Sequence, residues 1–199
     1  MSRVAIIDSG GANIASLLYA FERLDTVAEL TTDANTIRSA KHVLLPGVGA
    51  ARDAMQRLAD TGLVDVIRDL KQPVLGICLG MQLLCDASEE EDTECLGIIP
   101  GVARKLAVAE DFAVPNMGWC ATSQSARHPI LDGVEDHSWF YYLHSYALPL
   151  TEHTLASARH AGDFSAMIGK DNFVAAQFHP ERSSQAGAKL LANFLEWEA

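Results

Sequence analysis

The stretch VLGICLGMQLL, residues 74–84, places Cys78 between Gly76 and Gly80 where an apolar run changes character. Glycines two positions before and after a residue suit a sharp turn from a buried strand into a helix, because the missing Cβ lets the backbone approach closely. Such a turn holds the thiol at the helix N-terminus, where free N–H groups and the helix dipole favour a thiolate. The stretch therefore predicts a cysteine nucleophile at a strand end, with a buried structural cysteine as the alternative.

The first half of the chain alternates between short apolar runs and helical patterns. We expect strands at residues 3–8, 27–32, 42–47 and 74–77, and helices at residues 13–24, 51–70 and 79–87. Such alternation is typical of βαβ units, and the nearly continuous apolar character of the strands indicates a buried parallel sheet. The predicted fold class is α/β, with a doubly wound, mostly parallel sheet flanked by helices.

The second half has a different texture, with strands joined by turns rather than by helices. We expect strands at residues 101–106, 138–148, 154–160 and 172–178, as antiparallel additions to the sheet. A final helix is expected over residues 185–197, with Ser183 or Ser184 as its N-cap. Four of its apolar residues share one face: Leu190, Leu191, Phe194 and Leu195.

Length, charge and cysteine usage narrow the class of protein. The 199 residues, 49% hydrophobic and without an evident linker, predict a single domain over residues 1–199. A net charge of −11 with scattered basic residues argues against a nucleic-acid surface. No apolar run reaches the roughly 18 residues of a membrane span and no secretion signal is evident, so we expect a cytoplasmic protein. The cysteines lack CxxC spacing and no complete nucleotide motif occurs, so we expect neither metal nor cofactor.

A base for the thiol is predicted in the run VAAQFHPE, residues 174–181. Proline biases His179 toward an extended conformation, in which residues two apart project to the same side, so that Glu181 can lie beside the imidazole. Cys78, His179 and Glu181 would then form the cysteine counterpart of a hydrolase triad. A second His-Pro pair, His128-Pro129, is followed by residues that indicate only a turn.

A glycine-rich loop, LLPGVG at residues 44–49, is expected at the same carboxyl edge of the sheet as Cys78. Ligands bind at this edge in open α/β sheets. Backbone N–H groups of Gly47, Val48 and Gly49, with that of Leu79, would form an oxyanion hole. The alternative for the loop is an ordinary turn between a strand and a helix.

Six motifs follow one another along the chain: DSGGANIAS (8–16), LPGVG (45–49), LGICLGMQLL (75–84), PNMGW (115–119), FYYLHSY (140–146) and QFHPERSS (177–184). GxCxG with PGVG upstream and HPE near the C-terminus resembles the class I, triad-type glutamine amidotransferases, from the first strand to the last helix. GMQLL, MGW and HSY narrow the resemblance to the glutaminase subunits of imidazole glycerol phosphate synthase, in histidine biosynthesis.

The resemblance implies hydrolysis of the glutamine side-chain amide, with Cys78 as nucleophile, His179 as general base and acid, and Glu181 as the residue that orients His179. The implied contacts for glutamine are Gln82, Glu90, Ser145 and Tyr146. Gln82 lies one helical turn after the nucleophile, on the face that i, i+4 spacing defines. A carboxylate such as Glu90 suits an α-ammonium, although residues 89–91 would otherwise be a solvated acidic loop.

Ammonia released into neutral water becomes mostly ammonium, which is not nucleophilic, so the product must pass directly to another site. The resemblance implies a heterodimer with a (β/α)₈-barrel cyclase subunit. The residues that resemble the family's interface positions are Gly11, Asn13, Ser16, Trp119, Tyr141 and Arg182. The alternatives are core packing for Trp119, a solvated side chain for Arg182 and a helix cap for Asn13.

Two residues depart from the family segment, which usually reads Pro-His-Met-Gly-Trp-Asn. Asn116 and Cys120 occupy its second and sixth positions here, so coupling to the partner would change while the triad stays intact. Two other functions remain open: a glutaminase of another pathway, such as anthranilate or pyridoxal phosphate synthesis, and a silent binding module on the same fold.

Overall fold

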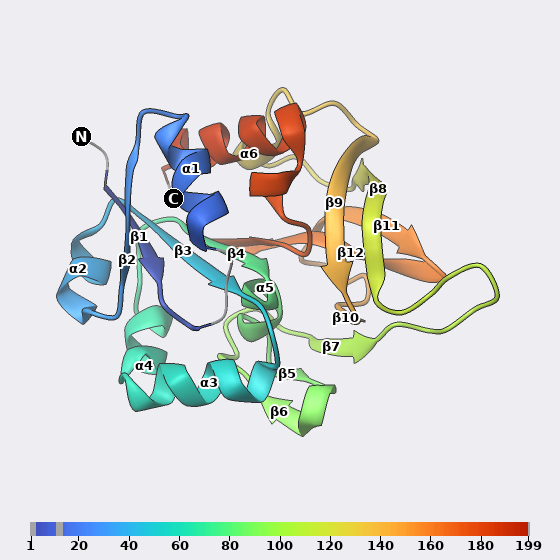
Figure 1. The fold of residues 1–199 in the computed structure, drawn as a ribbon, viewed down its shortest axis with the longest axis horizontal. Helices are drawn as coiled ribbons and strands as arrows, with labels where there is room; N and C mark the ends of the chain where they lie inside the picture. Colours follow the sequence, from blue (N-terminus) through green and yellow to red (C-terminus); the bar gives the residue numbers. More distant parts are fainter. Residues whose placement is uncertain (1–2, 11–13, 199) are drawn as a thin grey trace.

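The computed structural model describes residues 3–10 and 14–198, with helices around a large central sheet (Figure 1). This sheet has nine strands in the order β2-β1-β3-β4-β13-β12-β11-β8-β9. The strands are β1 (Arg3–Ile7), β2 (Val27–Thr31), β3 (His42–Gly47), β4 (Val74–Cys78), β8 (Asn116–Gln124), β9 (Ser138–His144), β11 (Thr154–His160), β12 (Gly162–Lys170) and β13 (Phe173–Ala176). Neighbours from β2 to β13 are parallel and those from β13 to β9 antiparallel, which confirms the predicted α/β class.

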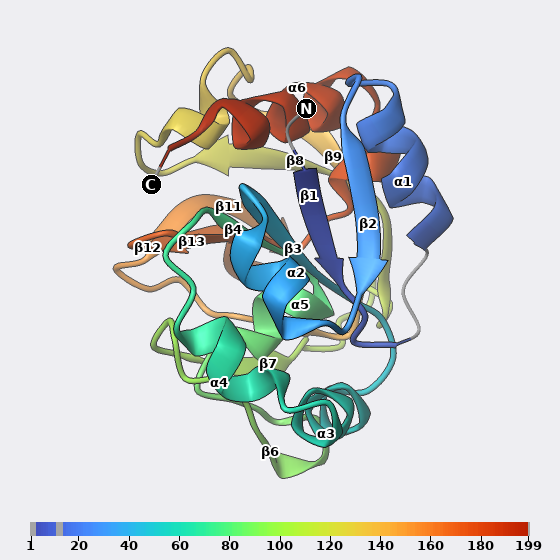
Figure 2. The same cartoon turned by 90° about the vertical axis from the view of Figure 1, so that its left-hand side faces the viewer.

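Helices cover both faces of the parallel half (Figure 2). The helices are α1 (Ile14–Glu22), α2 (Ala34–Ser39), α3 (Ala51–Asp60), α4 (Leu63–Arg68), α5 (Leu79–Leu83) and α6 (Ser184–Glu196). α1 and α6 lie on one face, and α2 to α5 lie on the other. Because side chains alternate along a strand, Val4 and Ile6 pack under α1 and α6, whereas Ala5 and Ile7 pack in the opposite core. Burial on both faces explains the continuous apolar runs.

A second, four-stranded sheet of short strands lies beyond α5 in the chain. Its order is β10-β7-β5-β6, with β5 (Ala87–Ser88), β6 (Thr93–Glu94), β7 (Val102–Lys105) and β10 (Tyr146–Ala147). The 3₁₀ helix η1 (Glu90–Asp92) joins β5 to β6. The predicted strand at residues 138–148 is therefore two strands, β9 and β10, which belong to different sheets and meet at Ser145.

Two predicted helices differ from the observed ones. The expected helix over residues 51–70 is two helices, because Gly62 adopts a left-handed conformation with φ of 67° between α3 and α4. The expected helix over residues 79–87 ends at Leu83, after which the chain turns to pair β5 with β7. Pairing with a distant strand overrides the local helical pattern there.

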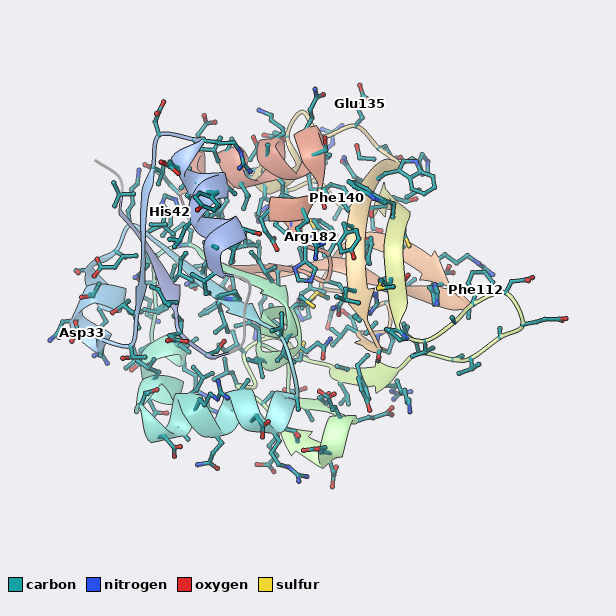
Figure 3. All side chains as sticks on the ribbon, viewed as in Figure 1. Asp33, His42, Phe112, Glu135, Phe140 and Arg182 are labelled. Atoms are coloured by element: carbon teal, nitrogen blue, oxygen red, sulfur yellow. The ribbon has the colours of Figure 1, made fainter. Side chains whose placement is uncertain are left out.

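The sequence pattern misses β8, β12 and α2. β8, with the sequence NMGWCATSQ, lacks a continuous apolar run because one of its faces is exposed. α2 is short and begins at Asp33, whose carboxylate accepts a hydrogen bond of 2.7 Å from Thr36 N. Figure 3 shows Asp33 at this exposed end of the molecule.

β13 is parallel to β4 and pairs Ala176 with Ile77, although the strands of the second half were expected to be antiparallel. The reason is the hairpin between β12 and β13, where Asp171 has a φ of 53° and the chain reverses. Parallel pairing brings the segment after β13 to the same sheet edge as Cys78.

The C-terminal helix α6 and the turn at His128-Pro129 both form where the sequence predicted them. α6 buries Leu190, Leu191 and Phe194 as predicted, and Leu195 is partly buried. Ser183 is its N-cap residue but makes no side-chain capping bond. The His128-Pro129 segment forms a 3₁₀ turn, η2 (Pro129–Leu131), in agreement with the prediction. Among the described residues, no helix has the length and apolar character that crossing a membrane requires.

Candidate active site

Cys78 ends β4 and immediately precedes α5, with φ of 55° and ψ of −111°. This backbone conformation is uncommon for a residue with a side chain and holds the thiol on a sharp strand-to-helix turn. A Cβ on Gly80 would lie 1.7 Å from Leu45 O, and one on Gly76 would lie 3.0 Å from Ala175 Cβ. Both flanking glycines are therefore required by close packing, as the spacing predicted.

His179 and Glu181 follow β13, with Glu181 in the 3₁₀ helix η3 (Pro180–Arg182). His179 Nδ1 donates a hydrogen bond of 2.9 Å to Glu181 Oε1, and the two side chains are only 10% and 3% exposed. The backbone N–H of His179 donates to Tyr141 O at 2.9 Å, and its carbonyl accepts from Ser183 Oγ at 2.6 Å. The histidine is thus held on both sides by β9 and by the start of α6.

Cys78 and His179 form one electrostatic unit. Burial by itself lowers the pKa of His179, but hydrogen bonds with Cys78 and Glu181 and the negative charge of both groups raise it to about 10. Since Nδ1 is engaged by Glu181, the ring faces the sulfur with Nε2. The arrangement favours the charged imidazolium of His179 beside Cys78. The three residues predicted as a triad are therefore brought together.

A cavity of about 580 Å³ opens beside Cys78 and His179. All four residues expected to contact glutamine line it: Gln82, Glu90, Ser145 and Tyr146. The predicted oxyanion residues Val48, Gly49 and Leu79 line it too, and Gly47 lines a small adjoining recess beside His179 and Glu181. The three predicted groups of residues thus surround one hollow.

The loop after β3 packs directly on the first turn of α5. A Cβ on Gly47 would lie 3.0 Å from Leu79 Cβ and 3.2 Å from Gly80 N, and Gly49 has a φ of 93°. Ser9 Oγ donates to Pro46 O at 2.6 Å and fixes the base of the loop. The backbone of the loop is therefore close to the backbone of Leu79, as an oxyanion hole requires.

Glu90 differs from its acidic neighbours. Its Oε2 accepts a hydrogen bond of 2.9 Å from Ala51 N at the start of α3, and the residue is half-buried, whereas Glu89 and Glu91 are exposed. Only this carboxylate of the acidic run lines the cavity. The interpretation of the run as a solvated loop is wrong for Glu90.

Of the expected interface residues, Arg182 lines the cavity and Tyr141 lies beside Arg182 and His179. The Arg182 guanidinium lies 4.4 Å from the centroid of the Tyr141 ring (Figure 3), and Trp119 meets Tyr141 edge-on with centroids 6.1 Å apart. Trp119 is 47% exposed, so it is not a core residue. Ser16 is half-buried on α1, and Gly11 and Asn13 lie outside the described residues.

Sequence reasoning missed two contacts of the nucleophile. Cys78 Sγ lies 3.6 Å from Leu143 O, and Gln177 Nε2 donates to Cys78 Sγ at 3.8 Å. A backbone carbonyl carries no sequence signal. Gln177 had one, since it lies two residues before His179 in an extended segment and so projects to the same side.

The comparison with known proteins agrees with these features. Residues 5–197 match the family described as glutamine amidotransferase class-I. The chain belongs to this family. This amidotransferase is 47% identical over 196 residues to the imidazole glycerol phosphate synthase subunit HisH of Xanthomonas axonopodis pv. citri (strain 306), with 98% of both chains covered. The same-named subunit of Xylella fastidiosa (strain Temecula1) is 46% identical over 199 residues, with 100% of both chains covered. These relatives confirm the resemblance indicated by the motifs.

Solved structures show that the amidotransferase fold is shared at much lower identity. A protein from Thermoplasma acidophilum described as part of a GMP synthase has a TM-score of 0.74 at 20% identity, covering 98% of this chain and 93% of that chain. A glutamine amidotransferase from Thermotoga maritima has a TM-score of 0.71 at 15% identity, covering 98% and 96%. The likeness is one of fold.

Proposed function

We propose that this amidotransferase is the glutaminase subunit of an imidazole glycerol phosphate synthase in histidine biosynthesis. It hydrolyses glutamine and passes the ammonia to a cyclase subunit. The observation that carries the proposal is that Cys78, His179 and Glu181 line one cavity of about 580 Å³, with Glu181 hydrogen-bonded to His179. Full-length relatives with the name HisH support the choice of this pathway over other amidotransferases.

The first chemical step releases ammonia. The Cys78 thiolate forms a C–S bond with the carboxamide carbon, and backbone N–H groups of Val48, Gly49 and Leu79 bind the oxyanion. His179 gives its Nε2 proton to the departing nitrogen. The C–N bond then breaks, ammonia leaves, and a glutamyl thioester and a neutral His179 remain.

The second step releases glutamate. Neutral His179 takes a proton from water while the water oxygen attacks the thioester carbon, and the C–S bond breaks. Glutamate leaves, and the thiolate–imidazolium pair is restored. Glu181 holds the ring through Nδ1, so that Nε2 is the nitrogen left for proton transfer.

The cavity offers complementary groups for the two ends of glutamine. The Glu90 carboxylate suits the α-ammonium, and it is held in place by Ala51 N. Gln82 lines the cavity beside Tyr146, whose carbonyl accepts from Gln82 Nε2 at 3.0 Å, and Ser145 lines it too. These four residues would fix the amino acid so that its side-chain amide reaches Cys78.

The exposed face of β8 and β9 is the surface we assign to the cyclase. Side chains of Met117, Trp119 and Trp139 are 68%, 47% and 59% exposed, and the register pairs Met117 with Leu143 and Trp119 with Tyr141. An exposed sheet face that carries two tryptophans and a methionine is typical of a protein interface. Leu143 also supplies the carbonyl that contacts Cys78, so docking on this face reaches the nucleophile directly.

The proposed setting is the cytoplasm. All four cysteines are free thiols, which is the state expected in a reducing compartment. The cyclase and the precursor nucleotide would be present there.

Glutamate release measured with and without the cyclase and its nucleotide tests the proposal. We expect slow hydrolysis by the isolated chain and a large increase with the liganded cyclase. Cys78→Ala should bind the cyclase but release no glutamate. Equally fast hydrolysis with and without the cyclase would contradict dependence on docking. Activation by the synthase of another pathway, but not by the cyclase, would contradict the choice of partner.

A further inference from the structure

Gln177 is a polar residue of the site to which the mechanism above gives no task. It follows β13, its side chain is completely buried, and its backbone N–H donates to Ala166 O at 2.9 Å. Its neighbour Phe178 points the other way, into the core against Phe140. Gln177 and His179 both lie beside Cys78: Gln177 Nε2 is 3.8 Å from its sulfur, and His179 lines the same cavity as Cys78.

A chain of hydrogen bonds fixes the orientation of the Gln177 amide. Tyr146 O is a carbonyl and can only accept, so the group of Gln82 that lies 3.0 Å from it must be Nε2. The same Nε2 lies 3.2 Å from the Gln177 amide, which must present Oε1 to it. Nε2 of Gln177 is thereby directed at the sulfur, 3.8 Å away. The amide cannot flip without placing donor against donor.

We propose that Gln177 is a further catalytic residue, which donates an N–H to the Cys78 sulfur and is aimed by Gln82. The proposal rests on the proposed function only in taking Cys78 as the nucleophile. A hydrogen bond to a charged acceptor is stronger than one to a neutral acceptor, so the contact favours the thiolate over the thiol. It favours the thiolate both as the attacking group and as the group that leaves the thioester.

The hydrogen bond between Gln177 and Gln82 also determines which group Gln82 presents to the cavity. Gln82 lines the glutamine cavity and uses both N–H groups, one on Tyr146 O and one on Gln177 Oε1. It therefore offers its oxygen, an acceptor, to a ligand in the cavity. The side-chain amides of Gln82 and Gln177 thus connect the lining of the cavity to the Cys78 sulfur through consecutive hydrogen bonds.

Alkylation of Cys78 tests the proposal without requiring glutaminase activity. The probe is iodoacetamide at pH 6, with the Cys78 peptide quantified by mass spectrometry, because the thiolate is the species that reacts. Gln177→Glu keeps the shape and the acceptor for Gln82 but removes the donor to the sulfur. Gln177→Leu removes both contacts. The matched control is Gln56→Glu, which adds the same charge on the exposed surface of α3.

We expect Cys78 alkylation to slow about tenfold or more in Gln177→Glu and in Gln177→Leu, and to stay within about twofold of wild type in Gln56→Glu. Wild-type rates in both Gln177 variants, with melting curves that show folded protein, would overturn the proposal. Slow alkylation combined with no glutamate release in any complex would leave Gln177 in its role and reject the proposed function alone.

A measurement on the wild-type chain covers the case in which the variants do not fold. The side-chain amide signals of Gln177 in a ¹⁵N NMR spectrum should shift when Cys78 is alkylated. Those of Gln72, which bonds Ile37 O far from the site, should not shift. A Gln177 amide signal that ignores alkylation would overturn the proposal.

Discussion

The two residues that depart from the family segment, Asn116 and Cys120, bond to each other, and Asn116 also bonds to His144, which lines the cavity. Asn116 Nδ2 donates to His144 Nε2 at 3.0 Å, and Cys120 Sγ donates to Asn116 Oδ1 at 3.6 Å. His144 Nδ1 in turn donates to Tyr146 O at 2.9 Å. Burial lowers the pKa of His144 to about 4, so this ring stays neutral and keeps both roles. Asn116 and Cys120 therefore help to position His144 and Tyr146, which line the cavity.

Removing the charge of Glu181 tests the electrostatics of the pair at this scale. In Glu181→Gln the pKa of His179 should fall below about 10, because one of the two anions that favour the imidazolium is lost. We expect kcat/KM for glutamine, measured with the cyclase, to fall about tenfold or more, with the alkaline limb of its pH profile moved to lower pH. The exposed Glu152→Gln serves as the control. An alkaline limb that stays in place would contradict this assignment.

The junctions between elements decide where the site lies. The turn from β4 into α5 packs against the end of β3, and the start of α6 is tied to β9 and His179 through Ser183 Oγ. A Cβ on Gly187 would lie 2.0 Å from Pro180 O, so α6 also presses on η3. Segments remote in the sequence are thereby packed together around His179 and Cys78.

A methyl group at the β4–α5 junction should be poorly tolerated. In Gly80→Ala the new Cβ would overlap Leu45 O, which belongs to buried backbone. We expect the free energy of unfolding, from denaturant titration, to fall by about 3 kcal/mol. Gly162→Ala is the matched control, because nothing lies within 4 Å of its Cβ position, and its change should stay within about 0.5 kcal/mol. Similar stabilities of the two variants would count against the close approach.

The exposed β8–β9 face carries the docking prediction. Trp119→Ala and Trp139→Ala should each weaken binding to the cyclase about tenfold or more, because exposed tryptophans at an interface centre carry much of the affinity. Val27→Ala, an exposed apolar residue on β2 at the opposite edge of the sheet, should bind like wild type. Calorimetric titration measures all three. Unchanged affinity in both tryptophan variants would place the cyclase elsewhere.

At the scale of the whole molecule, the C-terminal segment contacts two histidines, the buried His42 and the half-buried His128. His42 Nε2 donates to Trp197 O at 3.1 Å and its ring meets Phe194 edge-on, and the His128 ring meets the Trp197 ring at 4.9 Å. Both contacts of His42 are made with the end of α6 and with the residue that follows this helix. Burial lowers the pKa of both histidines, so the folded protein holds them neutral.

Acid should therefore lower the free energy of unfolding, because both histidines are held neutral in the folded chain. Below pH 6.5 the unfolded chain binds protons at His42 and His128 that the folded chain does not, so the free energy of unfolding falls as the pH falls. We expect His42 to contribute on the order of 1 kcal/mol of loss between pH 7 and pH 5. In His42→Leu the unfolding free energy should be lower at pH 7 but should fall less steeply with acid. The exposed His137→Gln should keep the wild-type slope, and an unchanged slope in His42→Leu would contradict the prediction.

The local features of the site could be derived from the sequence because they depend on neighbours in the chain. The glycines around Cys78 indicate the sharp turn, since only the missing Cβ of Gly80 permits its close approach to Leu45 O. His179 and Glu181 are neighbours two residues apart and do meet, although the chain turns into η3 after His179 instead of continuing extended as expected. The alternation of apolar runs and helical patterns likewise predicted the parallel half of the sheet.

Strand pairing and side-chain exposure were decided only by the tertiary structure. The hairpin after β12 makes β13 parallel to β4, and this non-local pairing brings His179 and Gln177 to Cys78. The strand expected at residues 138–148 divides at Ser145 because its two parts pair with strands of different sheets. The exposed side of β8 and β9 exists because no element of the described chain covers it. Register and coverage depend on partners distant in the sequence, which local pattern does not encode.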